Sequence, residues 1–496
     1  MTHRNISSRS PLKRFAKNLF LIAVTAVITL WVVRAYNSRS MPDTAAWHEP
    51  ALESEFRARD YPDGIAFQEY LQLERKLAAE LDQFTRTRIA AVEAQRAIRY
   101  IPGSPMNSNE HETNWNWSFV MPHKAAVGTA VLIHGASDSP YSMRAVAERL
   151  NHNGLNAIVI RSPGHGTLPG ELTRARVADW QAIVRSAITE AQKMNAPNQP
   201  IYLVGYSMGG ALAVNYTLES LTDESLVRPD GIVLISPAIA ISRFAAFANL
   251  DLMFSRMPGF KKFAWTSINP EYDPYKYNSF PKQTGRQTYI LTKANLNMIE
   301  RLRHTESWSE LPPIITFMSA VDATVSVRAV VDNLYRPIRS DGSALVLFGV
   351  NQTNQTLGFL KQDYLGSVNA VINDSERSFD LTVVGNKNGK SQEVIATTYC
   401  AKDKCLSVEE LALSWPESIF SLSHVALPFS PADPVYGSAS SDDSPGTFTL
   451  GSLQPRGERG ILVVSTDNLM RLRYNPFIDY LLDRTSEFCE LESSAE

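Results

Sequence analysis

The most constraining feature of the chain is the stretch VGYSMGG at residues 204–210, in which one serine lies among glycines. An apolar run, IYLVG, precedes the serine and a run of small residues, GALAVNY, follows it. The pattern predicts a buried strand that passes at once into a helix. Side chains two positions before or after Ser207 would collide in so sharp a turn, and Gly205 and Gly209 remove that collision. The turn would project the serine oxygen from the end of a sheet, with a helix N-terminus facing any negative charge that develops there.

Strands and helices are expected to alternate from about Trp115 onward. Strand-like runs such as GTAVLIHG and PIYLVG are almost wholly apolar, and helix-like runs such as VADWQAIVRSAITEAQKM lie between them. Because strands of this kind must be covered on both faces, the pattern predicts an α/β fold with a mostly parallel sheet and helices on both sides. The 496 residues, 44% of them hydrophobic, suffice for one large domain with insertions or for two smaller domains.

The charge of the chain excludes one class of partner. The formal net charge is −3, and acidic and basic residues are mixed along most of the chain. A protein that binds nucleic acid needs a broad basic surface, and this composition does not provide one. We therefore expect no nucleic-acid partner.

His424 is the candidate base for a serine nucleophile. A serine needs a base to become reactive, and the base in turn needs an acid. In a sheet of this kind the three follow in the order serine, acid, histidine. Of the nine histidines only His424 lies beyond residue 304, and its surroundings, SLSHVALPF, suit a loop. The earlier His134 breaks the order, and we interpret it as a structural hydrogen-bonding residue.

Asp322 is the candidate acid. It follows the apolar run IITFM in the short loop SAVDATVS, so it would stand at the carboxyl end of a buried strand. Asp332, Asp341 and Asp363 also lie between the serine and the histidine, but none follows a strand so directly. The expected catalytic residues are therefore Ser207, Asp322 and His424.

Two backbone N–H groups are expected to hold the oxyanion of a tetrahedral intermediate. One belongs to Met208, directly after the serine. The other belongs to the loop after an earlier strand, VLIHGASDSPYSM, with Ala136 as the candidate. This chemistry requires no metal and no organic cofactor, and the cysteines and histidines show no zinc-ligand spacing.

Five motifs, IHGASDSPYSM, RSPGHGTLPGEL, GYSMGG, SAVDATVS and SHVALPF, together resemble the α/β-hydrolase superfamily. Within it they look like the serine hydrolases related to monoacylglycerol lipase and lysophospholipases. The resemblance covers residues 115–434 and leaves out the N-terminal helix and the C-terminal tail. It implies that His134 and Gly135 shape the oxyanion hole, that Ala136 donates its N–H, and that His165 lies in a structural turn near the site.

Two segments depart from the plain hydrolase pattern. Residues from about 238 to 310 are rich in aromatic residues and methionine, which favours a cap over the active site; ordinary helical packing on the sheet is the alternative.

The run SALVLFGV reads as the last core strand, and an insertion of about 351–415 then precedes His424. Within it, FDLTVVGNKNGKSQEVIATTYC predicts a β-hairpin. The insertion would serve substrate recognition or partner binding, or it would have no specific function.

The N-terminus carries a membrane-targeting pattern. Basic residues and no acidic residue precede the apolar run LFLIAVTAVITLWVV at 19–33, which reaches spanning length if Phe15 and Ala16 join it. The following VRA is a poor cleavage site, so an uncleaved signal anchor is favoured over a signal peptide. With the basic head in the cytoplasm, the rest of the chain would lie on the extracytoplasmic (periplasmic or extracellular) side, or be secreted if the segment is cleaved.

Three parts of the chain are expected. Residues 1–36 form the cytoplasmic head and the anchor or signal peptide, and residues 111–496 form the hydrolase domain. Residues 37–110 form a linker, up to about Glu55, and an amphipathic helix that begins after Pro62, where apolar residues recur at three- and four-residue steps.

The three cysteines allow two interpretations. Cys400 and Cys405, in YCAKDKC, would close a small disulfide in an oxidising compartment and leave Cys489 unpaired. Three reduced thiols are the alternative.

The expected function is that of a membrane-anchored serine hydrolase. It would cleave a carboxylic ester, with an acyl lipid such as a monoacylglycerol or a lysophospholipid as the leading substrate, through an acyl-enzyme. Acyl transfer and amide hydrolysis use the same three residues, so they stay as alternatives. A membrane-tethered binding protein without turnover is the rival from another class. The sequence does not identify any protein partner.

Overall fold

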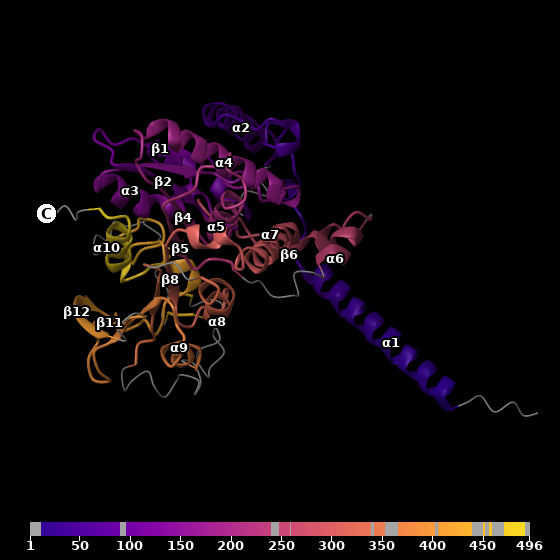
Figure 1. Cartoon of the computed structure of the whole chain (residues 1–496). Coiled ribbons are helices and arrows are strands. Elements are labelled where there is room, and N and C mark those ends of the chain that lie inside the picture. Colours follow the sequence, from indigo (N-terminus) through magenta and orange to yellow (C-terminus); the bar gives the residue numbers. More distant parts are fainter. Residues whose placement is uncertain are drawn as a thin grey trace, which may run out of the picture.

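Figure 1 shows the computed structural model of the chain, in which a long helix projects from a body built around one sheet. The structure describes residues 11–89, 96–239, 248–257, 259–338, 342–352, 366–401, 405–438, 450–451, 456–458 and 471–491. The projecting helix is α1 (Pro11–Ser40). Its part Lys13–Ser40 is long and apolar enough to cross a membrane, by length and composition alone.

The described strands of the body form a ten-stranded sheet and a separate pair. In the large sheet the order is β1-β3-β2-β4-β5-β8-β9-β10-β11-β12. The strands from β3 to β10 in this order run parallel, while β1, β11 and β12 are antiparallel to their neighbours. The strands are β1 (Phe119–Met121), β2 (Gly128–Ile133), β3 (Leu155–Ile160), β4 (Ile201–Tyr206), β5 (Gly231–Ile235), β8 (Ile314–Ser319), β9 (Ala344–Phe348), β10 (Asp380–Asn386), β11 (Glu393–Tyr399) and β12 (Leu406–Ser414), and the separate pair is β6 (Trp265–Ser267) and β7 (Phe280–Pro281).

Helices cover both faces of this sheet. Along β2, Val131 and Ile133 pack into the cluster that contains α4, α5 and α7, whereas Ala130 and Leu132 face the cluster that contains α3 and α10. The α/β architecture with a mostly parallel sheet is therefore confirmed, because such strands are buried on both faces. The helices are α2 (Phe67–Arg88), α3 (Arg144–His152), α4 (Val177–Met194), α5 (Met208–Ser220), α6 (Ala248–Phe254), α7 (Lys282–Leu302), α8 (Val327–Val330), α9 (Gly366–Ile372) and α10 (Ile478–Phe488), with shorter turns η1 (Ala46–His48), η7 (Pro169–Thr173), η9 (Lys261–Ala264) and η13 (His424–Ala426).

The sheet extends further than the sequence predicts. Strand β10 pairs in parallel with β9, so SALVLFGV is not the last core strand. The two strand-like runs expected to form a hairpin are β10 and β11, which pair antiparallel. The hairpin thus continues the central sheet. A disulfide joins Cys400 to Cys405 between β11 and β12, and Cys489 is a buried free thiol.

The segment expected to be a linker is packed against the body. The side chain of Trp47 is fully buried, in a cluster with Leu77 and Leu168. Glu55 is buried as well, and its carboxylate pairs at 3.1 Å with the guanidinium of Arg161. The segment differs from the expectation because apolar and charged contacts from distant residues order it, and its Pro- and Ser-rich composition does not reveal them.

Glu171, in η7, also holds this N-terminal segment. Its Oε1 accepts hydrogen bonds from the N–H groups of Ala51 and Leu52 at 2.7 and 2.9 Å. Burial, with the neighbouring charge of Glu55, raises the pKa of Glu171 from 4.5 to about 7. The carboxyl group is therefore protonated in the folded protein at pH values where it would be ionised in the unfolded chain.

We expect this group to make stability fall as the pH rises. Because the folded pKa lies above the unfolded one, the folded state binds more protons between the two values, and the stabilisation is lost as the pH rises from 4.5 toward 7. Between about pH 5 and about pH 7.5, the wild type should lose about 2–3 kcal/mol more unfolding free energy than Glu171→Gln. Denaturant unfolding of both proteins in detergent measures this, and equal losses would contradict it.

Candidate active site

Ser207 occupies the turn between β4 and α5. Its backbone has φ 54° and ψ −112°, a conformation that residues other than glycine rarely adopt. Its N–H donates to the carbonyl oxygen of Ile235 at 2.9 Å, and its own carbonyl oxygen accepts from the N–H of Ala238 at 2.9 Å. The end of β5 therefore holds the strained turn in place.

Gly205 and Gly209 flank the serine at positions where a side chain would not fit. A Cβ at Gly205 would lie 2.5 Å from the carbonyl oxygen of Gly209, and a Cβ at Gly209 would lie 2.0 Å from the carbonyl oxygen of Ile133. Both contacts are with backbone atoms, which cannot swing aside as a flexible side chain can. The close approach of α5 to the sheet therefore requires glycine at these positions.

Gly209→Ala is expected to destabilise the protein by at least about 3 kcal/mol, because the new methyl group forces α5 away from β2. The matched control is Gly285→Ala in α7, where a Cβ would meet only the ring of Phe280 at 3.8 Å. That variant should be as stable as the wild type or more stable by about 0.5–1 kcal/mol, since alanine favours a helix interior. Thermal unfolding compares the two, and similar melting temperatures for both variants would contradict the close contact.

Ser207, His424 and Asp322 come together at the carboxyl ends of the parallel strands. The Nε2 atom of His424 lies 3.1 Å from Oγ of Ser207, and its Nδ1 atom lies 2.8 Å from Oδ2 of Asp322. Ser207 follows β4, Asp322 lies in the loop after β8, and His424 begins η13. A proton on Nδ1 would donate to the carboxylate and leave Nε2 as an acceptor for the serine hydroxyl. This arrangement can activate a serine oxygen for attack on a carbonyl carbon.

The carboxylate of Asp322 is held in its ionised form. Its Oδ1 accepts from the N–H groups of Thr324 and Val325 at 2.8 Å each. Burial by itself would raise the pKa of Asp322, but the charge and hydrogen bond of His424, helped by these two N–H groups, lower the pKa below its usual value. An ionised carboxylate at this position fixes the orientation of the imidazole.

The alternative acids do not compete for this position. Asp332 forms ion pairs with Arg328 and Arg336, at 3.3 and 3.4 Å, in and after α8. Asp341 and Asp363 lie outside the described residues.

The backbone N–H groups of Ala136 and Met208 are available to a ligand. Met208 is the first residue of α5, where N–H groups have no partner within the helix. Neither this N–H nor that of Ala136 donates to another described residue. On its carbonyl side, Ala136 is held by His165, whose Nε2 lies 3.0 Å from the carbonyl oxygen. The two N–H groups can therefore serve as oxyanion donors.

A buried ion pair fixes the loop that carries Ala136. The Nζ atom of Lys276 lies 2.8 Å from Oδ1 of Asp138, and both side chains are less than a tenth exposed. Next to it, the N–H of Tyr277 donates to the carbonyl oxygen of Ser137 at 2.8 Å. The segment before β7 therefore holds the loop after β2. Removal of one member of such a pair leaves a buried charge without compensation.

Lys276→Met should destabilise the protein by about 3–5 kcal/mol, because it leaves the Asp138 carboxylate buried and unpaired. Adding Asp138→Asn to this variant should restore most of the lost stability. As a control, Lys193→Met removes a lysine that pairs at 3.6 Å with Glu190 on the surface and should change stability by less than about 1 kcal/mol. Chemical denaturation measures the three effects. Equal losses for the two lysine variants would show that the buried pair has no special role.

Glu458 and Arg471 contact the site, and the sequence did not indicate either of them. The Oε2 atom of Glu458 accepts from the N–H of His424 at 2.8 Å and pairs with Arg471 at 3.2 Å. Arg471 also donates to Oγ1 of Thr324 at 2.9 Å, two residues after Asp322. This pair connects the loops of the candidate base and the candidate acid. A glutamate in RGERG shows no local pattern that could have identified it.

Two further histidines lie near the site, and their contacts fit structural roles. His134 accepts the N–H of Ser162 through Nε2 at 3.0 Å, and its Nδ1 lies 2.8 Å from the carbonyl oxygen of Gly135. Burial lowers the pKa of His134 and of His165. Within the part of the chain that the structure describes, no group of three or more His, Cys, Asp or Glu residues is placed to hold a metal ion.

The segment that contains Ser207 and Asp322 matches a known family of hydrolases. Residues 124–348 match the family described as "Serine aminopeptidase, S33". The chain is 33% identical over 110 residues to the thermostable monoacylglycerol lipase of Bacillus sp. (strain H-257), a match that covers 22% of this chain and 42% of that protein. It is 28% identical over 129 residues to phospholipase YtpA of Bacillus subtilis (strain 168), covering 26% and 45%. The chain thus spans less than half the length of these curated relatives.

Solved structures include similar chains. One is the monoacylglycerol lipase of Paleococcus ferrophilus, with 19% identity, a TM-score of 0.36, and coverage of 47% of this chain and 88% of that chain. The family match and the curated relatives confirm the resemblance to the α/β-hydrolase superfamily that the motifs indicated.

Proposed function

We propose that this chain, with its α/β-hydrolase fold, is a membrane-anchored serine hydrolase that cleaves carboxylic esters of acyl lipids. The observation that carries the proposal is the continuous set of hydrogen-bonding distances from Ser207 through His424 to Asp322, on a strained turn between strand and helix. A hydroxyl, an imidazole and an ionised carboxylate in this order form the catalytic triad of serine hydrolases.

The proposed reaction proceeds through an acyl-enzyme. His424 takes the proton of the Ser207 hydroxyl as the oxygen attacks the ester carbonyl, and the N–H groups of Ala136 and Met208 bind the oxyanion. The imidazolium, oriented by Asp322, gives the proton to the leaving alcohol. Water then attacks the acyl-enzyme, with His424 again as the base, and releases the carboxylic acid and the free serine.

The curated relatives and the residues of the proposed cap both favour an acyl-lipid substrate. Curated relatives are named as monoacylglycerol lipases and a phospholipase, which favours a monoacylglycerol or a phospholipid-like ester. We assign residues from about 238 to 310, including α6, η9 and α7, to a cap over the acyl pocket. The many aromatic residues and methionines of this segment suit an acyl chain.

The proposed location follows from α1. This helix serves as an uncleaved anchor, with the basic head in the cytoplasm and the catalytic body on the extracytoplasmic side. The Cys400–Cys405 disulfide supports an oxidising compartment. The corresponding division of the chain is 1–36 for the head and anchor, 37–110 for the N-terminal region and 111–496 for the hydrolase domain. The insertion of about 351–415 carries the hairpin at the far end of the sheet.

Amide hydrolysis is the second candidate, because the matching family is described as a serine aminopeptidase. The same three residues serve ester and amide substrates, and only the leaving group differs.

The test is covalent labelling of the full chain with a fluorophosphonate, followed by hydrolysis of esters of rising chain length and of matched amides. Ser207→Ala should abolish labelling. Turnover should fall by about 10³-fold or more in Ser207→Ala, Asp322→Asn and His424→Ala, because each removes a member of a cooperating set. Preference for long acyl esters supports the lipid assignment. A folded wild type that neither labels nor hydrolyses any of these compounds would favour a membrane-tethered binding protein.

A further inference from the structure

The end of α1 contacts the segment that contains α6 and η9. The ring centroid of Trp31 lies 5.3 Å from that of Phe254 and 6.4 Å from those of Phe260 and Phe263. Figure 1 shows α6 beside the end of α1 at which the body begins. If α1 spans a bilayer, Trp31 lies near its outer end, at the depth that tryptophan prefers.

The same segment presents apolar side chains beside the helix. Met253 and Met257 are 55% and 49% exposed. Lys262 fixes the segment to the residues after α1, because its Nζ lies 2.8 Å from the carbonyl oxygen of Met41 and 2.8 Å from the carboxylate of Asp43. The region between α6 and η9 therefore lies at the level of the membrane surface when α1 is inserted.

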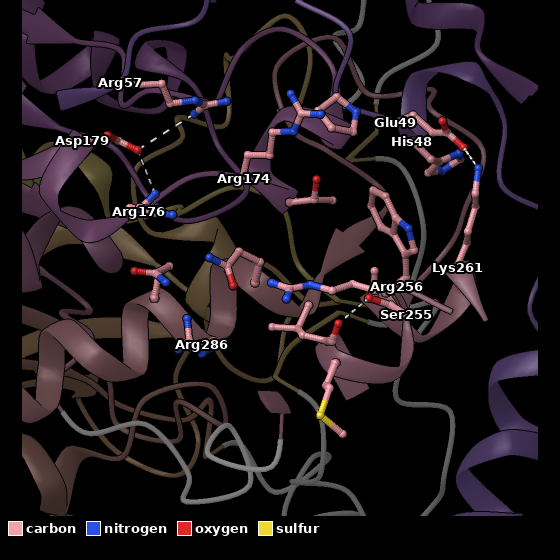
Figure 2. Close-up of a pocket in the computed structure, with 18 of the residues that line it drawn as sticks. His48, Glu49, Arg57, Arg174, Arg176, Asp179, Ser255, Arg256, Lys261 and Arg286 are labelled. Carbon is pink, nitrogen blue, oxygen red and sulfur yellow. Dashed lines mark hydrogen bonds and ion pairs between the residues drawn. The ribbon is translucent and has the colours of Figure 1, made fainter. Parts of the chain in front are cut away.

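A pocket of about 1300 Å³ opens next to this region. Its walls come from η1 and the residues after it, the loop before α4, the segment from α6 to β6, and the first turns of α7 (Figure 2). Ser207, Asp322 and His424 do not line it, so it is separate from the candidate active site.

Some of the charges in this pocket are compensated locally. Arg57 lies 3.3 Å from a carboxylate oxygen of Glu171 and 4.0 Å from one of Asp179, and the other ion pairs are Arg59–Asp60 and Lys261–Glu49. Seven residues of the lining are arginine or lysine and two, Glu49 and Asp179, are acidic, so the lining as a whole carries a net positive charge.

Arg174 and Arg256 have no ion-pair partner among the described residues, and both are exposed. They come from different walls of the pocket: Arg174 lies in the loop before α4, and Arg256 follows α6 (Figure 2). Arg176 and Arg286 belong to the same lining. A guanidinium group presents several donors in a plane, which matches the oxygens of a phosphate group.

We propose that this pocket binds the phosphate of an anionic phospholipid headgroup at the membrane surface. The proposal rests on the anchoring role of α1, because only an inserted α1 brings the pocket to the level of the headgroups. Arg174 and Arg256 contact the phosphate, and the exposed methionines of the neighbouring segment face the lipid chains. The bound headgroup would hold the proposed cap against the lipid from which the substrate comes.

The test is native mass spectrometry of the full chain in detergent, with added phosphatidylglycerol or phosphatidylcholine. The Ser207→Ala background prevents hydrolysis of the lipid. We expect phosphatidylglycerol to bind at least about tenfold more tightly than phosphatidylcholine. Arg174→Gln/Arg256→Gln should abolish this preference. The matched control Arg75→Gln/Arg88→Gln removes two exposed arginines of α2 that do not line the pocket, and it should keep the preference.

Three outcomes would overturn the proposal. Equal binding of the two lipids would show that charge does not select the ligand. Unchanged preference in Arg174→Gln/Arg256→Gln would place the lipid elsewhere. Displacement of phosphatidylglycerol by an equal concentration of inorganic phosphate would identify a site for free phosphate.

A separate measurement distinguishes this proposal from the proposed catalysis. With the serine restored, Arg174→Gln/Arg256→Gln should hydrolyse a soluble short-chain ester at the wild-type rate, because neither arginine contacts the candidate active site. Loss of that hydrolysis would show that the pocket belongs to the catalytic machinery, which contradicts its separation from the candidate active site. Lipid selectivity without any ester hydrolysis would support the pocket and contradict only the catalytic proposal.

Discussion

The close approach of α5 to the central sheet is the constraint on which the candidate site depends. A methyl group at Gly209 would lie 2.0 Å from the carbonyl oxygen of Ile133, so the helix can begin where it does only with glycine at that position. The approach places Ser207 at a positive φ, directly after a buried strand. It also leaves the N–H of Met208 at the start of the helix, beside the serine oxygen that is proposed to react.

Buried charges hold the loops around this turn. Arg161 lies between the carboxylates of Glu55 and Glu74, at 3.1 and 2.8 Å, and so connects the N-terminal region to the end of β3. Lys276 and Asp138 connect the proposed cap to the loop after β2. Buried ion pairs add little net stability compared with apolar residues, but loss of one partner is costly. Their effect here is to allow one arrangement of segments that are far apart in the sequence.

Helix α1 and the loop that carries Ala136 are both contacted by the segment proposed as a cap. Trp31 of α1 contacts Phe254 and Phe260, while Tyr277, further along that segment, donates to the carbonyl oxygen of Ser137 in the loop after β2. The proposed membrane helix and the proposed oxyanion loop are thus both contacted by residues 248–277. A lipid held beside this segment would lie next to the proposed cap.

The sequence by itself determined the features that depend on local chemistry. Apolar runs and their period predicted the strands and helices of the central layer, and the sterics of a sharp turn required Gly205 and Gly209. The order of the residues then selected Asp322 and His424, which the structure places within hydrogen-bonding distance of each other. The tertiary structure alone decided that Glu458 supports His424, that Trp47 is buried, and that β10 extends the sheet. These features depend on contacts between residues distant in the chain, and such contacts leave no periodic pattern in the sequence near either partner.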